Sequence, residues 1–98
     1  MLTLFRNNPV TPVAASTLSI TSGGTAQTVF SANKGGYEFE FQNQSTGDLY
    51  ISTAGTAALG TGFKVAPGQF YSSSGKRIYT ALSVWGATTA QNFYAEQW

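Results

Sequence analysis

The chain contains no cysteine and no histidine among its 98 residues. Without cysteine it can form no disulfide, offers no thiolate nucleophile and cannot build a cysteine-based zinc site. Without histidine it lacks the side chain that most often moves protons near neutral pH and most often binds metals. We therefore expect no metal site and no cofactor.

Charge is also scarce, because only 9 % of the residues are charged and the net charge is +1. The five basic residues are scattered, and only Lys76 and Arg77 are adjacent. Proteins that bind nucleic acids carry a basic stripe or patch, so we expect no nucleic-acid partner. No apolar run approaches the roughly 20 residues of a membrane span, and no secretory signal is expected at the N-terminus. We expect no membrane partner.

Three polar arrangements could carry chemistry, and each has a simpler interpretation. Glu38 and Glu40 point to one face of a strand, as a catalytic carboxylate pair would, but also as an ordinary solvent-facing pair does. Ser74 and Lys76 resemble a Ser–Lys dyad, yet such a dyad needs a buried lysine, and this lysine lies in a glycine turn. Asp48 has no obvious companions for an oxygen-ligand cation site. We expect no catalytic residues and no enzyme activity.

Short apolar stretches alternate with turn residues along the chain, and no segment has helical periodicity. Threonine, serine and glycine make up about a third of the residues, which favours strands and turns over helices. The expected strands cover residues 16–21, 26–30, 37–42, 49–52, 63–66, 69–73, 77–85 and 91–98. Short strands at this spacing predict an all-β fold, an antiparallel and jelly-roll-like β-sandwich of about eight strands.

The clearest strand is 37–42, where Tyr37, Phe39 and Phe41 alternate with polar residues at a period of two. The last strand, 91–98, places Phe93 and Ala95 on the opposite face from Asn92, Tyr94, Glu96 and Trp98. Residues 77–85 leave the core-facing side open, because two alternations are both partly apolar. One runs through Ile78, Thr80, Leu82 and Val84, and the other through Arg77, Tyr79, Ala81, Ser83 and Trp85.

Residues 1–15 differ from the rest, and we expect an extended N-terminal arm followed by a single β-sandwich domain over 16–98. Pro9 and Pro12 fix φ and push the preceding residues toward extended conformations. The arm is either an edge strand of its own domain or a segment that lies on a neighbouring subunit. Only 21 residues are leucine, isoleucine, valine or phenylalanine, close to the roughly 20 % floor for globular chains. So thin a core favours an oligomer.

Aromatic residues offer one further possibility, because all-β domains often bind sugars by stacking an exposed ring on them. The candidates for such a platform are Trp85, Trp98 and the five tyrosines. The alternative is that Trp85 belongs to the core or to an interface, since Leu82 and Val84 lie beside it.

From residue 43 to the C-terminus, the motifs resemble those of small accessory structural proteins of tailed bacteriophage virions, the type that decorates or cements the capsid. These motifs are Asn43-x-Ser45, Asp48-Leu49-Tyr50-Ile51-Ser52, a Gly/Ala/Thr loop to Gly62, Val65-Ala66-Pro67-Gly68, Ile78-Tyr79-x-Ala81 and a last strand ending at Glu96-x-Trp98.

This resemblance implies a non-enzymatic homotrimer that bridges subunits of the major capsid protein on the virion surface, made in the host cytoplasm. Aromatic and arginine side chains are common interface anchors, and the apolar arm suits a strap. The expected partner-contact residues are Leu2, Leu4, Phe5, Arg6, Arg77 and Trp98. Two alternatives stay open: a tail or head–tail connector component, and a carbohydrate-binding module on the virion surface.

Overall fold

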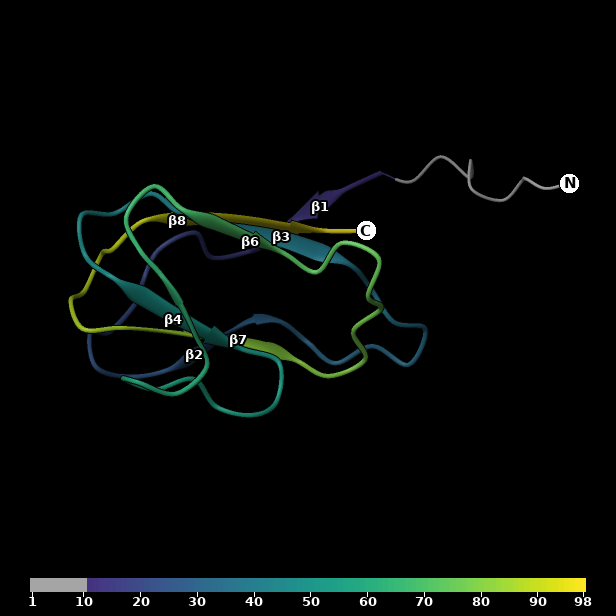
Figure 1. Ribbon diagram of the computed structural model, residues 1–98, viewed down its shortest axis with the longest axis horizontal. Coiled ribbons are helices and arrows are strands. Elements are labelled where there is room, and N and C mark those ends of the chain that lie inside the picture. The colour runs from purple at the N-terminus through teal and green to yellow at the C-terminus, as the bar shows by residue number, and fades with distance from the viewer. Residues whose placement is uncertain (1–10) are drawn as a thin grey trace, which may run out of the picture.

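The computed structural model describes residues 11–98, which form eight strands. These are β1 (Val13–Ala14), β2 (Gln27–Phe30), β3 (Phe39–Asn43), β4 (Leu49–Ser52), β5 (Phe63–Val65), β6 (Phe70–Ser72), β7 (Leu82–Gly86) and β8 (Phe93–Gln97). The first sheet has the order β1-β8-β3-β6 and packs on the second, β2-β7-β4-β5 (Figure 1). Within residues 11–98 no helix has the length and apolar character needed to cross a membrane. The expected all-β sandwich is confirmed.

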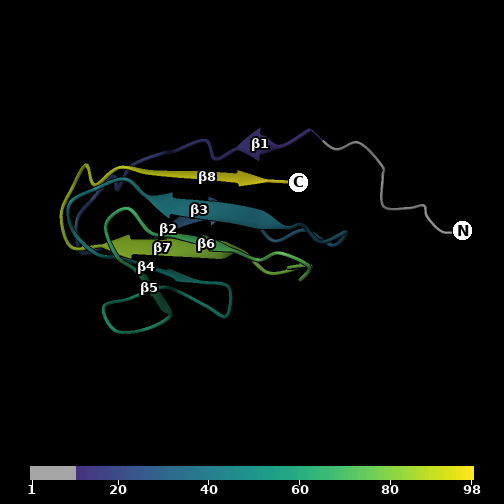
Figure 2. The ribbon, with the colours of Figure 1, turned by 45° about the horizontal axis from the view of Figure 1, so that its top comes forward.

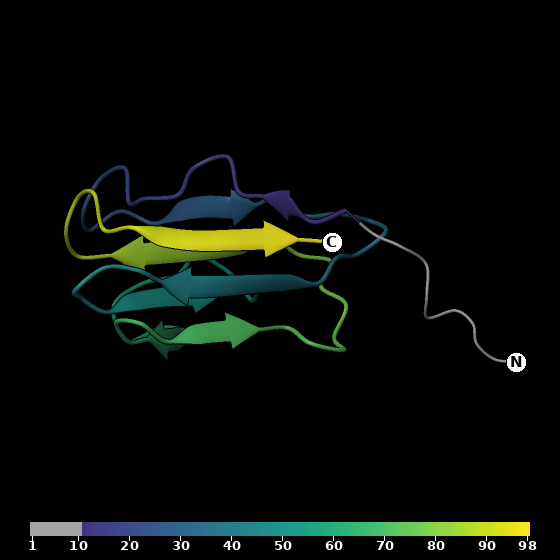
Figure 3. The ribbon, with the colours of Figure 1, turned by 90° about the horizontal axis from the view of Figure 1, so that it is seen from above.

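The strand pairing is that of a jelly roll. The first strand pairs with the last, β2 with β7, β3 with β6, and β4 with β5, all antiparallel. The chain is therefore one long hairpin rolled into a sandwich. The additional pair β3–β8 completes the first sheet, and the additional pair β4–β7 completes the second. Figures 2 and 3 show the consequence: the last strand, β8, lies between β1 and β3. The jelly-roll expectation is confirmed.

Aromatic side chains fill the space between the two sheets. Phe39 and Phe41 are completely buried, as the period of two predicts, and Phe41 stacks on Phe93 with ring centroids 5.1 Å apart. On the opposite sheet, Leu82 and Val84 are also completely buried. The alternation that includes Leu82 and Val84 thus faces the core, which answers the question that the sequence left open for residues 77–85.

Two expected strands are shorter or less regular than predicted. Residues 16–21 form no strand, because their backbone makes only one isolated bridge. This bridge joins Ser19 to Asn92, just before β8 of the same chain. Leu18 is exposed there while Ile20 is buried, so these two side chains do not share a face. In residues 77–85 the continuous strand starts only at Leu82, because the earlier part pairs only through a single bridge at Ile78.

The N-terminal stretch enters the sheet before the expected domain boundary at residue 15. Val13 and Ala14 pair with Gln97 and Glu96 of β8, and the amide of buried Ala15 donates to the carbonyl of Ala95 at 2.8 Å. This part of the stretch is an edge strand of its own sandwich. Residues 1–10, the rest of the expected arm, lie outside the described residues.

Asn43, at the end of β3, is a completely buried polar residue that joins the two sheets. Its side-chain amide donates to the carbonyls of Gly47 and of Val65 in the second sheet, both at 2.7 Å. Its side-chain oxygen accepts from the amide and the hydroxyl of Ser45. Because buried polar groups are costly unless they are satisfied, this network fixes the β3–β4 turn.

We expect Phe41→Ala to lower the free energy of unfolding by about 3–5 kcal/mol, because it opens a cavity beside Phe93 in a closely packed core. Urea unfolding at 25 °C measures the effect. The control is Phe70→Ala, which truncates a ring that is 66 % exposed and should change stability by no more than about 0.5 kcal/mol. Equal losses in the two variants would contradict the assignment of the core.

Candidate interaction surface

Four of the residues expected to contact partners, Leu2, Leu4, Phe5 and Arg6, lie outside the described residues. The other two, Arg77 and Trp98, lie at the same end of the sandwich. Arg77 packs against the 33–36 loop, and this loop together with Trp98 lines a hollow of about 360 Å³ at that end. The two described members of the set thus lie near the same loop, but only Trp98 lines the hollow.

The guanidinium of Arg77 is bound within its own chain. Its Nη1 donates to the carbonyls of Gly35 and Gly36, at 3.2 and 3.3 Å. A Cβ atom at Gly36 would overlap Cγ of Arg77, and Gly36 has φ +77°, which glycine adopts most readily. Arg77 thus holds two loops together, and this contact leaves it less available as an anchor for another molecule.

Trp98 is half-buried and extends the first sheet by one residue pair. Its amide donates to the carbonyl of Glu38 at 3.0 Å, and its carbonyl accepts from the amide of Glu38 at 2.9 Å. Tyr37, which lines the same end hollow, donates its hydroxyl to the carbonyl of Thr80 at 2.7 Å. Burial raises the pKa of the Tyr37 hydroxyl, so it stays protonated as a donor.

The outer face of the first sheet carries three of the four acidic residues of the chain, Glu38, Glu40 and Glu96. Side chains of paired residues point to the same face of a sheet. The register therefore places Glu96 beside Glu40 in one row of this face, and Tyr94 and Phe70 on either side of Gln42 in the next.

A hollow of about 240 Å³ lies across these two rows. We call it the acidic groove; it is lined by Glu40, Phe41, Gln42, Phe70, Tyr94 and Glu96. The hydroxyl of Tyr94 donates to Oε2 of Glu96 at 3.3 Å. Partial desolvation, the charge of Glu96 and this hydrogen bond raise the pKa of Tyr94. The acidic groove thus presents two exposed rings beside two carboxylates.

The outer face of the second sheet carries an aromatic pair beside a basic residue. Tyr50 lies between Lys64 and Trp85 in one row of that face. The ring centroids of Tyr50 and Trp85 are 6.0 Å apart, and the rings meet edge to face. Trp85 is therefore half-buried on an outer face and not part of the core.

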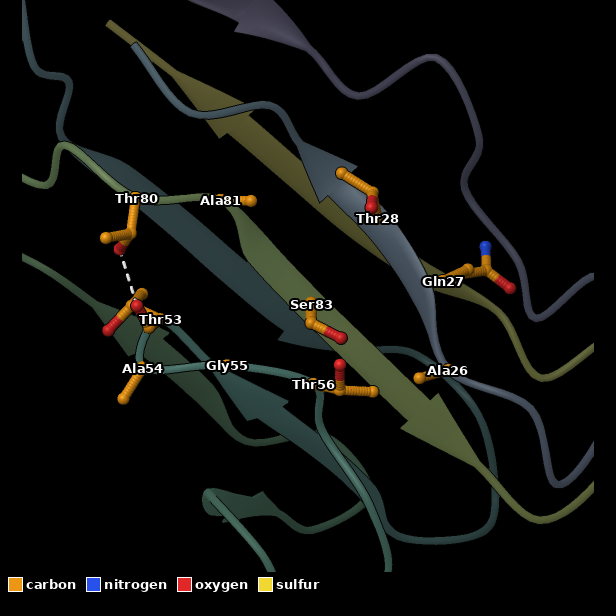
Figure 4. A pocket seen from close by; sticks show the side chains of 10 residues that line it. All are labelled: Ala26, Gln27, Thr28, Thr53, Ala54, Gly55, Thr56, Thr80, Ala81 and Ser83. Atoms are coloured by element: carbon orange, nitrogen blue, oxygen red, sulfur yellow. Dashed lines mark hydrogen bonds between the residues drawn. The ribbon is translucent and has the colours of Figure 1, made fainter. Parts of the chain in front are cut away.

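A trough of about 500 Å³ lies beside the same sheet, between the 53–56 loop and the edge strand β2 (Figure 4). The loop is held over β7 by two contacts: the Thr80 hydroxyl donates to the carbonyl of Thr53, and the amide of Ala57 donates to Oγ of Ser83 at 3.0 Å. All the lining side chains are small or neutral, and none is charged or aromatic. The trough offers shape but no reactive group.

Two of the polar arrangements singled out in the sequence meet at one hydrogen bond, and the third lies apart from them. Glu40 in β3 and Glu38 just before it lie on the same face of the first sheet. Glu38 accepts from the amide of Gly75, in the turn that holds Ser74 and Lys76, at 3.1 Å. Ser74 and Lys76 are exposed in the turn that follows β6. Asp48 is exposed in the turn before β4. Among residues 11–98, no three acidic, histidine or cysteine side chains gather as a metal-binding group would require.

The acidic groove contains residues that the sequence did not single out as a site: Phe70, Tyr94 and Glu96. Tyr94 and Glu96 belong to the polar face of the last strand, and Glu40 to the acidic face of the 37–42 strand. The alternation in each strand therefore shows that these side chains face outward. No pattern within a single strand shows that the two strands are neighbours. Comparisons of the chain with protein families, with curated proteins and with solved structures find no match.

We expect Arg77→Ala to lower the free energy of unfolding by about 1 kcal/mol, because two carbonyls lose their charged donor. For a domain of this size, that corresponds to a fall in Tm of roughly 4–8 °C. The control is Lys76→Ala in the neighbouring turn position, which should change stability by no more than about 0.5 kcal/mol. If both variants have the same Tm as the parent protein, Arg77 does not hold the two loops together.

Proposed function

We propose that this protein is a non-enzymatic structural protein of a tailed-bacteriophage virion, which decorates the capsid as a homotrimer and stabilises it by bridging subunits of the major capsid protein. The observation that carries the proposal is the exposure of large apolar side chains. Leu59, Phe63, Phe70 and Tyr79 are each more than half exposed. Burying these side chains against a neighbouring protein would remove their apolar surface from water, which favours association.

The fold and the resemblance of the motifs support the same proposal. Jelly rolls occur in viral capsid proteins as well as in lectins, although a fold alone does not determine a function. A sandwich with a small core is also stabilised when its exposed apolar groups are buried against neighbours. A protein that works in this way needs buried area and no reactive group.

Purified virions should contain this protein in a copy number that scales with the number of capsid subunits. When the purified protein is added to shells that lack it, the shells should become more resistant to heat or denaturant. Binding only to the assembled shell stabilises it by about 2.7 kcal/mol at a hundredfold excess over Kd. Quantitative mass spectrometry and shell-disruption assays measure the two effects. A copy number like that of tail proteins would favour a tail or connector position, and absence from the particle would reject the proposal.

A second candidate is a carbohydrate-binding module on the virion surface, and the position of Trp85 favours it. The ring lies on an outer face beside Tyr50, with Lys64 next in the same row. An aromatic pair of this kind can stack on the apolar face of a sugar ring. The neighbouring hydroxyl and amine can serve as hydrogen-bond donors to sugar hydroxyls.

For this candidate, Trp85→Ala should weaken glycan binding at least about tenfold, since an aromatic contact contributes up to about 1.5 kcal/mol beyond its buried area. A glycan array followed by titration measures the loss, and circular dichroism confirms the fold. Phe70→Ala, which removes an exposed ring from the other sheet, should leave the binding unchanged. A parent protein that binds no glycan rules this candidate out.

A further inference from the structure

We propose that the acidic groove of one molecule binds the N-terminal segment, residues 1–10, of a second copy of the same chain. In this arrangement Leu4 lies between the two rings of the acidic groove, and the guanidinium of Arg6 lies between its two carboxylates. The inference deepens the proposed function, because it names the contact that would hold the trimer together. The contact itself can be tested in solution without any virion.

The two glutamates of the acidic groove lie opposite each other on adjacent strands. Glu40 and Glu96 are register partners, and the Cβ atoms of such partners lie about 4.5–5.5 Å apart. Like charges in this position destabilise a sheet. The four strands of the first sheet contain no lysine or arginine to offset them. A cation supplied from outside the sheet would convert this repulsion into attraction.

The rings of the acidic groove are exposed although their strands are well paired. Phe70 is 66 % exposed and Tyr94 is 38 % exposed, so neither ring contributes much to the core. They stand on either side of Gln42 and leave an open hollow between them. An aliphatic side chain in this hollow would bury apolar surface of both rings. The occupant that fits the acidic groove is thus both apolar and cationic.

The N-terminal segment has this chemistry. Residues 1–10 combine Leu2, Leu4 and Phe5 with Arg6, and they contain no acidic residue. Arginine matches a pair of carboxylates well, because its planar fork donates several hydrogen bonds at once. Its guanidinium can also lie over an aromatic ring. The other four basic residues lie outside the strands of the first sheet.

The spacing of the two partners also matches. In an extended segment, Leu4 and Arg6 point to the same side and lie about 6.6–6.8 Å apart, since each residue advances about 3.3 Å. The row of rings and the row of carboxylates are likewise two residues apart along β8, at Tyr94 and Glu96. A segment that runs along the strands therefore places Leu4 over the rings and Arg6 over the carboxylates simultaneously.

The direction of the chain at its first described residues favours binding to a second molecule over binding in cis. Val13 pairs with Gln97 in an antiparallel register. When this register is continued, Pro12 is level with Trp98, and Thr11 lies beyond the end of the neighbouring strand. Pro9 and Pro12 bias the residues before them toward extended conformations, which opposes a reversal over the chain's own sheet. Ten extended residues can span up to about 33–36 Å, enough to reach a neighbouring sheet.

A contact between a segment of one molecule and a face of the next is a head-to-tail contact. Such contacts form a closed ring when the rotation between neighbours divides evenly into a full turn, and the expected trimer is a ring of this kind. Three linked molecules would also bind a capsid more tightly than one, because their contacts act together. The segment would thus contribute to decoration through assembly of the ring.

The oligomeric mass of the purified protein tests this inference. Size-exclusion chromatography with light scattering should give a trimer for the parent protein. A variant that lacks residues 2–10 should be a monomer, as should the double variant Glu40→Lys/Glu96→Lys. The deletion stops before β1, so the sandwich should remain intact, and circular dichroism melts verify this for both variants. Because the contact is ionic in part, high salt should weaken it.

Mixing the two monomeric variants distinguishes binding to a second molecule from binding in cis. The double variant still has its N-terminal segment, and the deletion variant still has its acidic groove, so together they should form a heterodimer. Adding Arg6→Glu to the double variant should restore the trimer, because the charges are then exchanged. Asp48→Lys, which makes the same kind of change at the one acidic residue away from this face, should leave the trimer unchanged.

Three results would overturn the inference. These are a monomeric parent protein, a deletion variant that still forms a trimer, and a mixture of the two variants that stays monomeric although both are folded. A monomeric parent protein would also remove the homotrimer from the proposed function, but the virion role itself fails only if the protein is missing from virions or does not stabilise shells. A trimer that assembles as described but does not occur in particles would uphold the contact and reject the virion role.

Discussion

The antiparallel register between β3 and β8 is the constraint on which both sides of the first sheet depend. It places Phe41 opposite Ala95 toward the core, and it places Glu40 opposite Glu96 toward the outside. Because side chains alternate between the faces of a strand, a slip by one residue would move every one of them to the wrong side. The stacking of Phe41 on Phe93 therefore also fixes the like-charged pair on the outer face. The acidic groove is a consequence of the same register that makes the core.

The network around Asn43 explains how the rolled hairpin keeps that register. Its side chain connects the end of β3 to the carbonyl of Val65 at the end of β5, and so ties the first sheet to the second where the chain crosses between them. The amides of Gly68 and Ser45 complete the cluster through hydrogen bonds to the backbone and side-chain oxygens of Asn43. A buried amide with all its partners specifies one arrangement, since any shift would leave a polar group unsatisfied. An apolar core alone tolerates repacking more readily.

Where the sequence signal is local, it predicted the strands well. Residues 37–42 and 49–52 became β3 and β4 with nearly the expected bounds, because alternation and flanking turn residues are properties of the segment itself. Residues 16–21 alternate as well, yet they pair only irregularly with the segment before β8. That pairing depends on a neighbour distant in sequence, which a local pattern does not reveal. For residues 77–85 both alternations were partly apolar, so only the packing of Leu82 and Val84 against the first sheet could decide between them.

The candidate site was harder to predict than the fold for the same physical reason. Each half of the acidic groove was visible as the polar face of a strand, but a groove exists only once β8 pairs with β3, two strands that are separated by half of the chain. A jelly roll makes such distant pairs by design, because its first half folds onto its last. Single-strand patterns thus indicate which side chains face outward, while the topology decides which of them meet. In this chain the topology places Glu40 beside Glu96 on an open sheet face, and in the proposed contact a cation from a neighbouring molecule would cover this like-charged pair. The proposed contact would couple assembly to the fold through one register, because the pairing of β3 with β8 makes both the core and the acidic groove.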